Sequence, residues 1–137
     1  MISTHLMRVA DALVSIAWKK PDVVRVLPLS VAPRSNGSQG VTRGGRYARA
    51  ETARKQREAA CRGFGRSRLR KAVTIRLVRI APRALDDDNL ASAMKSVRDG
   101  VADALGMDDR DSRVLWLCDQ ESGRPSVRVE VYREVRP

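Results

Sequence analysis

The chain has 137 residues, a length that fits one domain with a single hydrophobic core. It carries 27 lysine and arginine residues against 16 aspartate and glutamate residues, so its net charge is +11. A surplus of this size predicts a polyanionic partner, with nucleic acid as the first candidate. Two tryptophans, two tyrosines and one phenylalanine are too few for a base-stacking platform, and a single histidine argues against histidine-based catalysis.

The two cysteines, Cys61 and Cys118, form neither a zinc-binding set nor a disulfide framework. Their scarcity favours a reducing, cytoplasmic compartment. The apolar run at residues 12–18 is too short to cross a membrane. We therefore expect a soluble protein with no membrane partner and no small-molecule cofactor.

The first third of the chain predicts an amphipathic extension followed by the start of the domain. Apolar residues recur at helical spacing in residues 1–20, and we assign residues 21–137 to a single domain. The β-branched run at 23–31 predicts a strand, and Pro28 places this strand at a sheet edge or a bulge. Residues 32–45 are rich in Gly, Ser, Asn and Arg, which predicts a long loop that is either functional or disordered.

The remaining residues predict an α+β fold in one domain, with a small mixed β-sheet and helices packed against it. Residues 47–61 suit a helix ended by Gly63 and Gly65. The most regular helical pattern places Leu90, Met94, Val97, Val101 and Leu105 on one face and ends at Gly106. Three strands are expected at 73–80, 114–118 and 127–132, with a turn at 121–125.

Residues 41–71 contain eleven lysines and arginines but only two acidic residues. This density favours contacts with the phosphates of a nucleic acid over a merely solvated surface. The candidate DNA-binding residues are Arg43, Arg46, Arg49, Arg54, Lys55, Arg57, Arg66, Arg68, Arg70 and Lys71.

Residues 86–111 form an acidic island that holds eight of the sixteen acidic residues. Asp86 and Asp88 lie two apart in an extended stretch, so both side chains can project the same way, and Asp88 is placed to cap the helix that follows. After that helix, we expect the acidic turn at 107–111 to return beside residues 85–89 at the sheet edge. Clustered carboxylates repel one another unless a cation lies between them, and Mg²⁺ or Mn²⁺ suits such oxygen ligands.

Helical geometry adds a lysine to these carboxylates. At 100° per residue, Ser92, Lys95 and Asp99 fall within about 40° of Asp88, away from the apolar face. An ammonium group beside a carboxylate-bound metal is suited to phosphodiester cleavage, because it offsets charge that grows on the phosphoryl oxygens or the leaving group. The simpler alternatives are a solvated, helix-capping turn for the aspartates and an i,i+4 pair with Asp99 for Lys95.

The run LDDDNL, a helix with a lysine, the later GMDD turn, a valine-rich strand and an upstream PRSN loop resemble the RusA family of phage-type Holliday-junction resolvases. The resemblance implies a Mg²⁺-dependent active site in a homodimer. It places the metal ligands at Asp86, Asp88 and Asp109, the motif amide at Asn89 and the catalytic lysine at Lys95.

Two features depart from the family pattern. The family lysine usually lies about one helical turn after the second aspartate, whereas Lys95 follows Asp88 by seven residues. The turn also offers Asp108 and Asp111 as neighbours or substitutes for Asp109. Residues 1–20 have no counterpart in the resemblance.

Three hypotheses follow from these patterns. The first is an endodeoxyribonuclease of DNA recombination and repair that resolves four-way or other branched DNA as a homodimer. The second is a non-catalytic basic DNA-binding protein with a degenerate acidic site. The third, a basic RNA-directed protein of ribosomal type, explains the charge but not the order of the aspartates and the lysine.

Overall fold

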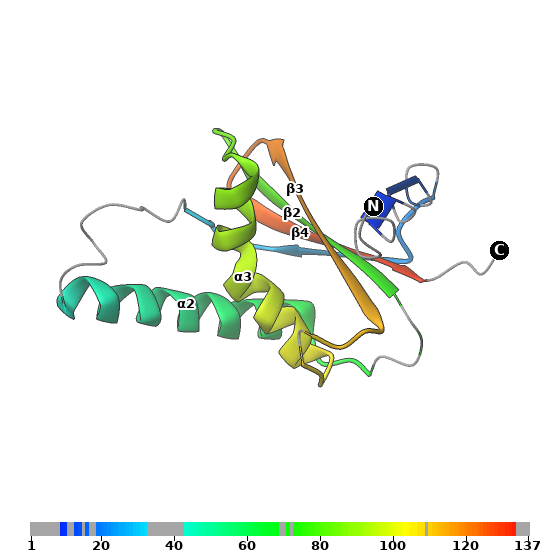
Figure 1. The fold of residues 1–137 in the computed structure, drawn as a ribbon, viewed down its shortest axis with the longest axis horizontal. Helices are drawn as coiled ribbons and strands as arrows, with labels where there is room; N and C mark the ends of the chain where they lie inside the picture. Colours follow the sequence, from blue (N-terminus) through cyan, green and yellow to red (C-terminus); the bar gives the residue numbers. More distant parts are fainter. Residues whose placement is uncertain are drawn as a thin grey trace, which may run out of the picture.

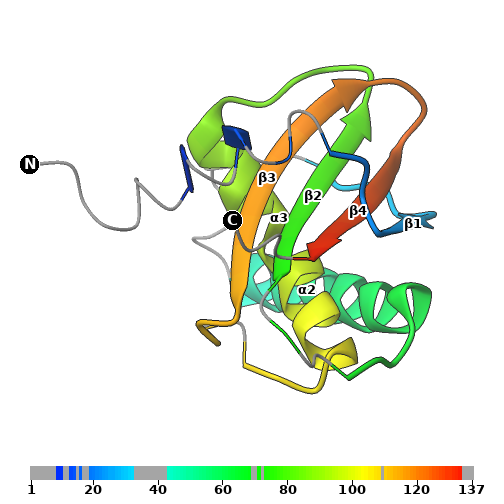
Figure 2. The same cartoon turned by 90° about the vertical axis from the view of Figure 1, so that its right-hand side faces the viewer.

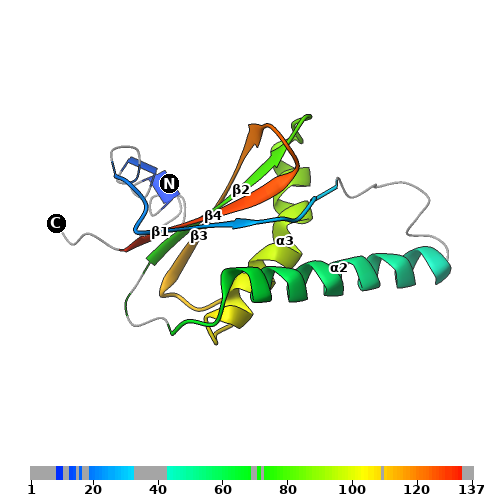
Figure 3. The ribbon, with the colours of Figure 1, turned by 180° about the vertical axis from the view of Figure 1, so that it is seen from behind.

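The computed structural model describes residues 9–10, 13–14, 16, 19–32, 43–68, 71, 73–108 and 110–133. These residues form one α+β domain in which two helices cover the same face of a four-stranded sheet (Figures 1 and 3). The predicted fold class is confirmed. The elements are β1 (Val23–Leu27), α2 (Arg43–Phe64), β2 (Val73–Ala81), α3 (Asp87–Ala104), β3 (Val114–Ser122) and β4 (Ser126–Arg133).

The strand order is β1-β4-β2-β3. β4 pairs antiparallel with both β1 and β2, whereas β3 lies parallel to β2. A parallel neighbour requires a crossover, and α3 supplies it. β1 is an edge strand, one of the two alternatives that Pro28 predicted, but it ends at Leu27 instead of at the predicted residue 31, so Pro28 lies just outside it. β3 is the opposite edge, and its nine residues contain no proline.

Alternation along the strands gives the sheet one apolar face and one polar face. In β2, Ile75 and Leu77 are fully buried in the core, while Arg76 between them points to the other side. Met94 and Val97 of α3 are also fully buried in this core. The stripe predicted for α3 therefore packs on the apolar face of the sheet.

The polar face carries a connected set of ion pairs across three strands (Figure 2 looks toward this face). Arg76 of β2 pairs with Glu130 of β4 at 3.0 Å and also with Asp119 of β3. Arg128 lies 2.8 Å from Glu130. The hydroxyl of Tyr132 donates to Glu130 at 2.8 Å, so this buried carboxylate has three partners.

The two helices cross at a point where only glycine fits (Figure 1). A Cβ on Gly100 of α3 would lie 2.3 Å from the carbonyl oxygen of Arg57 and 2.7 Å from the Cβ of Ala60, both on α2. The guanidinium of Arg57 reaches back to Asp103 of α3 at 2.6 and 2.8 Å. Close backbone contact and this ion pair fix α3 relative to α2.

Several predicted boundaries are wrong. α2 begins at Arg43, inside the segment predicted as loop, and continues through Gly63 to Phe64, where Gly65 adopts a φ of +84° and ends it. β3 continues to Ser122 through residues predicted as a turn, because it pairs with β2 along its whole length. Tertiary pairing and packing outweigh the local signals in both cases.

The predicted N-terminal extension and the long loop lie largely outside the described residues. Within the extension, residues 9–10, 13–14 and 16 have helical backbone. Nothing is described of residues 33–42. In the part of the chain that is described, no helix has both the length and the apolar character needed to cross a bilayer.

Candidate functional site

Asp86 is the N-cap of α3. Its backbone is extended, with φ −69° and ψ 165°, and its Oδ1 accepts a hydrogen bond from the backbone N–H of Asn89 at 2.9 Å. The prediction that Asp88 caps the helix is wrong, because α3 begins at Asp87 and Asp88 lies within its first turn. Capping uses one carboxylate oxygen of Asp86, and Asp88 does not cap the helix.

Asp87 and Asp88 are exposed at this helix end. Among the described residues neither carboxylate forms a hydrogen bond or an ion pair. Carboxylates in a first helical turn are stabilised by the positive end of the helix dipole. Asp86, Asp87 and Asp88 therefore form a negatively charged helix end with no cationic side chain paired to it in the described part of the protein.

Two buried or half-buried side chains hold the segment that leads into this helix end. Gln120 of β3 accepts from the backbone N–H of Leu85 at 2.8 Å and donates to the Leu85 carbonyl at 2.6 Å. Arg79 of β2, only 5% exposed, donates to the carbonyls of Val31 and Arg83 at 2.8 Å each. Neither was predicted. The position of Arg79 inside an apolar strand could have indicated that it has buried partners. No sequence feature near Gln120 indicates that it binds Leu85.

The acidic turn follows the other end of α3. Asp111 accepts from the backbone N–H and the guanidinium of Arg113, at distances between 2.7 and 3.3 Å. These bonds lower the pKa of Asp111 to about 2. Asp108 accepts from the backbone N–H of Arg110 at 2.9 Å. Asp109, the predicted third metal ligand, lies outside the described residues.

The two ends of the acidic island do not meet within one chain, so the predicted junction of residues 85–89 with 107–111 is wrong. α3 has 18 residues and separates them by about 27 Å at 1.5 Å per residue. Because β3 is parallel to β2, β3 must start at the sheet end where β2 also starts. The acidic turn therefore lies at the far end of α3 from Asp86 (Figure 1).

Lys95 shares a surface hollow of about 310 Å³ with the acidic turn. Asp99, Asp108 and Arg110 are among the residues that line it. Lys95 is exposed, and its seven-residue separation from Asp88 corresponds to about 10 Å along the helix. Lys95 and Asp108 thus line one hollow, whereas Asp86 and Asp88 do not line it.

The acidic residues at the two ends of α3 are candidates for a metal site. Across the described residues, no group of three or more His, Cys, Asp or Glu side chains is arranged to hold a metal ion. The helix end offers hard oxygen donors of the kind that Mg²⁺ prefers, at Asp86 and Asp88. A magnesium ion bound there would need further oxygen ligands beyond those that the described part of one chain provides.

The predicted DNA-binding residues differ in their exposure and in their partners. Arg54 pairs with Glu51 at 2.5 Å and with Glu58 at 2.9 Å, and Arg57 pairs with Asp103, so their charge is balanced within the chain. Lys55, Arg66, Arg68 and Lys71 are exposed, whereas Arg49 is half-buried and has a partner. Arg70 and the side chains of Arg43 and Arg46 lie outside the described part.

Comparison with known proteins adds no family assignment. No protein-family model matches the chain, and no curated protein matches its sequence significantly. The function of the site must therefore be argued from its residues and their placement.

Proposed function

We propose that the protein is a Mg²⁺-dependent endodeoxyribonuclease that resolves Holliday junctions or other branched DNA by paired hydrolysis of phosphodiester bonds, in recombination and repair. One observation carries the proposal. Asp86 and Asp88 present carboxylates without a cationic partner among the described residues, in a protein whose net charge is +11. Such carboxylates suit a divalent cation, and the surrounding charge suits DNA. This activity would place the protein in the cytoplasm.

A homodimer would supply the missing oxygen ligands. β3 is the edge strand of the described sheet and contains no proline, so it could pair antiparallel with β3 of a second copy. In such a pair the start of one β3 lies beside the end of the other. Gln120, near the end of β3, holds Leu85 next to Asp86. The acidic turn of the second copy, which precedes its β3, would therefore approach Asp86 and Asp88.

This arrangement gives the remaining residues a role. Lys95 lines the same hollow as Asp108 of the acidic turn. In the dimer, Lys95 would therefore approach Asp86 and Asp88 of the second copy together with that turn. Its ammonium group would then offset charge developing on the phosphate. A bound Mg²⁺ or Mn²⁺ would polarise the phosphoryl group and activate a water molecule. A two-fold symmetric dimer presents two equivalent sites, which matches the two strands that must be cut to resolve a junction.

The direct test is cleavage of a labelled four-way junction and of a matched linear duplex, with Mg²⁺, Mn²⁺ or EDTA. The proposal predicts metal-dependent paired nicks near the crossover. Asp88→Asn should reduce the rate by more than the roughly 100-fold that loss of an outer-shell metal partner costs. Asp87→Asn is the matched control, since it removes the same charge from the same exposed turn. Equal rates for Asp88→Asn and Asp87→Asn would reject the site.

The alternative is a basic DNA-binding protein with a degenerate acidic site. It is favoured by the lack of a three-carboxylate group among the described residues of one chain. This alternative predicts tight, salt-dependent binding that is indifferent to Mg²⁺, and no cleavage with any divalent ion. The same junction assay separates it from the nuclease.

A further inference from the structure

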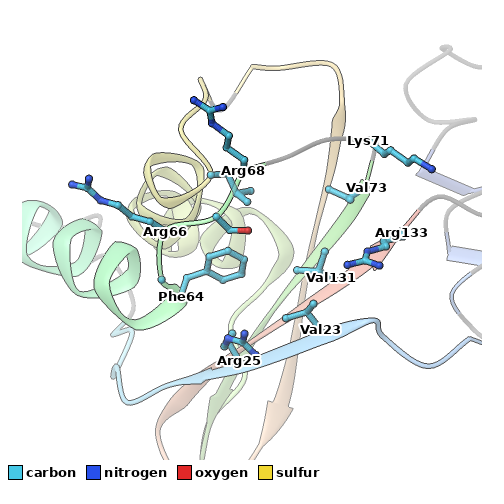
Figure 4. A pocket seen from close by; sticks show the side chains of 12 residues that line it. Val23, Arg25, Phe64, Arg66, Arg68, Lys71, Val73, Val131 and Arg133 are labelled. Carbon is cyan, nitrogen blue, oxygen red and sulfur yellow. The ribbon is translucent and has the colours of Figure 1, made fainter.

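A second hollow, of about 750 Å³, lies beside the C-terminal end of α2 and the adjacent ends of β1, β4 and β2 (Figure 4). We name it the basic hollow. Five cationic side chains and no acidic side chain line it. The cations are Arg25, Arg66, Arg68, Lys71 and Arg133.

The cationic side chains of the basic hollow form no ion pair with a described carboxylate, although the charge of Arg133 also attracts Asp22. None of its five cationic side chains forms an ion pair there, and Arg25 donates only to the carbonyl of Val24 at 3.2 Å. Elsewhere, Arg54, Arg76 and Arg128 each bind two carboxylates. Like charges gathered without counter-charges repel one another, and a bound anion removes that repulsion.

The floor of the basic hollow is apolar. Val23 of β1 lies directly opposite Val131 of β4, and Val73 and Leu105 continue this surface. The ring of Phe64 points toward the middle of the hollow (Figure 4). An anion site for phosphate alone would need no such floor, whereas an aromatic ring above an apolar surface suits a planar base.

Strand register places two of the arginines on either side of this floor. Arg25 follows Val23 by two residues and Arg133 follows Val131 by two, so each shares a sheet face with its valine. Figure 4 shows both beside the floor, while Arg66, Arg68 and Lys71 extend at the rim. The basic hollow therefore combines five cations, an apolar surface and one aromatic ring, within the size range of ligand pockets.

We propose that the basic hollow binds one unpaired nucleotide of a DNA strand, with the base against Phe64 and the flanking phosphates on Arg25 and Arg133. The proposal rests on DNA as the ligand named above but needs no cleavage. Branched DNA supplies unpaired nucleotides where its strands separate. Arg66, Arg68 and Lys71 at the rim would contact the phosphates that continue on either side.

The first test measures binding of a fluorescent oligo-dT strand by anisotropy, with the full chain in EDTA so that nothing is cut. Arg25→Gln combined with Arg133→Gln should weaken binding about tenfold. The matched control, Arg83→Gln combined with Arg124→Gln, removes two charges from exposed arginines outside the basic hollow and should have less than about a twofold effect. Equal losses in the two double variants would overturn the proposal.

The second test isolates the base. Phe64→Leu keeps an apolar side chain against the core but removes the aromatic face. It should weaken oligo-dT binding about fivefold, since stacking contributes roughly 1 kcal/mol or more per base. It should leave binding of an abasic strand of the same length unchanged. An equal loss for both strands would overturn the role of the base.

A third arm identifies the source of the nucleotide. Free dTMP should compete only at concentrations far above those of the strand, because the rim residues contact neighbouring phosphates that dTMP lacks. Competition by dTMP at equal concentration would overturn a strand in favour of a free nucleotide. If the protein cleaves junctions but Arg25→Gln with Arg133→Gln binds oligo-dT normally, the nucleotide-binding role of the basic hollow is rejected and the nuclease proposal is retained. If the protein cleaves no junction, the oligo-dT binding results still test the basic hollow, because they are measured in EDTA.

Discussion

The polar face of the sheet differs in its charge pairing from two places on the helix side, the start of α3 and the basic hollow. On the polar face, Arg76 and Arg128 share the buried Glu130 and each binds a second carboxylate. On the helix side, the carboxylates of Asp86 and Asp88 and the cations of the basic hollow lie at separate places without ion-pair partners among the described residues. Charges that pair inside the chain serve the fold. In the proposed function, the unpaired charges bind ligands outside the chain: a divalent cation at Asp86 and Asp88, and DNA phosphates at the basic hollow.

Gly100→Ala should have the largest effect on stability, and it provides the reference for a damaged fold. Alanine normally stabilises a helix relative to glycine, but here its Cβ would meet the Arg57 carbonyl oxygen. We expect the free energy of unfolding in urea to fall by about 3 kcal/mol. Ser92→Ala, on the exposed side of α3, should change it by less than about 0.5 kcal/mol. A more stable Gly100→Ala protein would contradict the close crossing.

Glu130→Ala tests whether the polar face is structural. Removing this buried carboxylate leaves Arg76 and Arg128 each with one partner and Tyr132 with none. We expect a loss of about 2 kcal/mol in unfolding free energy, with unchanged DNA affinity for the folded protein. Glu121→Ala, at the exposed end of the same set, should cost less than about 1 kcal/mol. Weakened DNA binding by folded Glu130→Ala would assign this face a binding role.

Lowering the pH should protonate the same carboxylate, Glu130, and destabilise the fold. Burial raises the pKa of Glu130, but hydrogen bonds from Tyr132, Arg128 and Arg76 outweigh burial and lower that pKa below its ordinary value of 4.5. The unfolded chain therefore binds the proton more readily, so this stabilisation is present above pH 4.5 and is lost as the pH falls through the lower native pKa. Urea unfolding across this pH range should show a smaller acid loss in Glu130→Gln than in the unmodified protein. Identical pH profiles would contradict the assignment.

Removal of the unpaired arginines should have the smallest effect on stability. Arg25→Gln with Arg133→Gln breaks no ion pair with a described residue, and it relieves repulsion among like charges. We expect the unfolding free energy to stay within about 0.5 kcal/mol of the unmodified value, while DNA affinity falls. A loss as large as that of Glu130→Ala would show that these arginines serve the fold instead of a ligand.

Much of the fold could be predicted from local patterns. The period of two in residues 73–80 and the helical stripe from Leu90 to Leu105 both correspond to observed elements. Pro28 correctly indicated an edge strand. The end of β3 could not be predicted, because Gln120 to Ser122 are polar and join the strand only through pairing with β2.

The candidate site was harder to predict than the fold. The sequence places Asp86 and Asp88 at the start of a helix and further aspartates after its end, but the direction in which the chain returns depends on which strand β3 joins. Parallel pairing with β2 sends the acidic turn to the opposite end of α3. Arg25 and Arg133 lie 108 positions apart in the sequence and share the basic hollow only through the pairing of β1 with β4.

The central claim is that each nuclease site is divided between two protomers, and mixed dimers test it most directly. Asp88→Asn and the double variant Asp108→Asn with Asp109→Asn would be co-expressed with different affinity tags, and only mixed dimers would be recovered. A divided site predicts that each variant alone is inactive, whereas the mixed dimer regains one intact site and nicks one strand of a four-way junction with Mg²⁺. Mixed dimers that bind the junction but never nick it would contradict the claim.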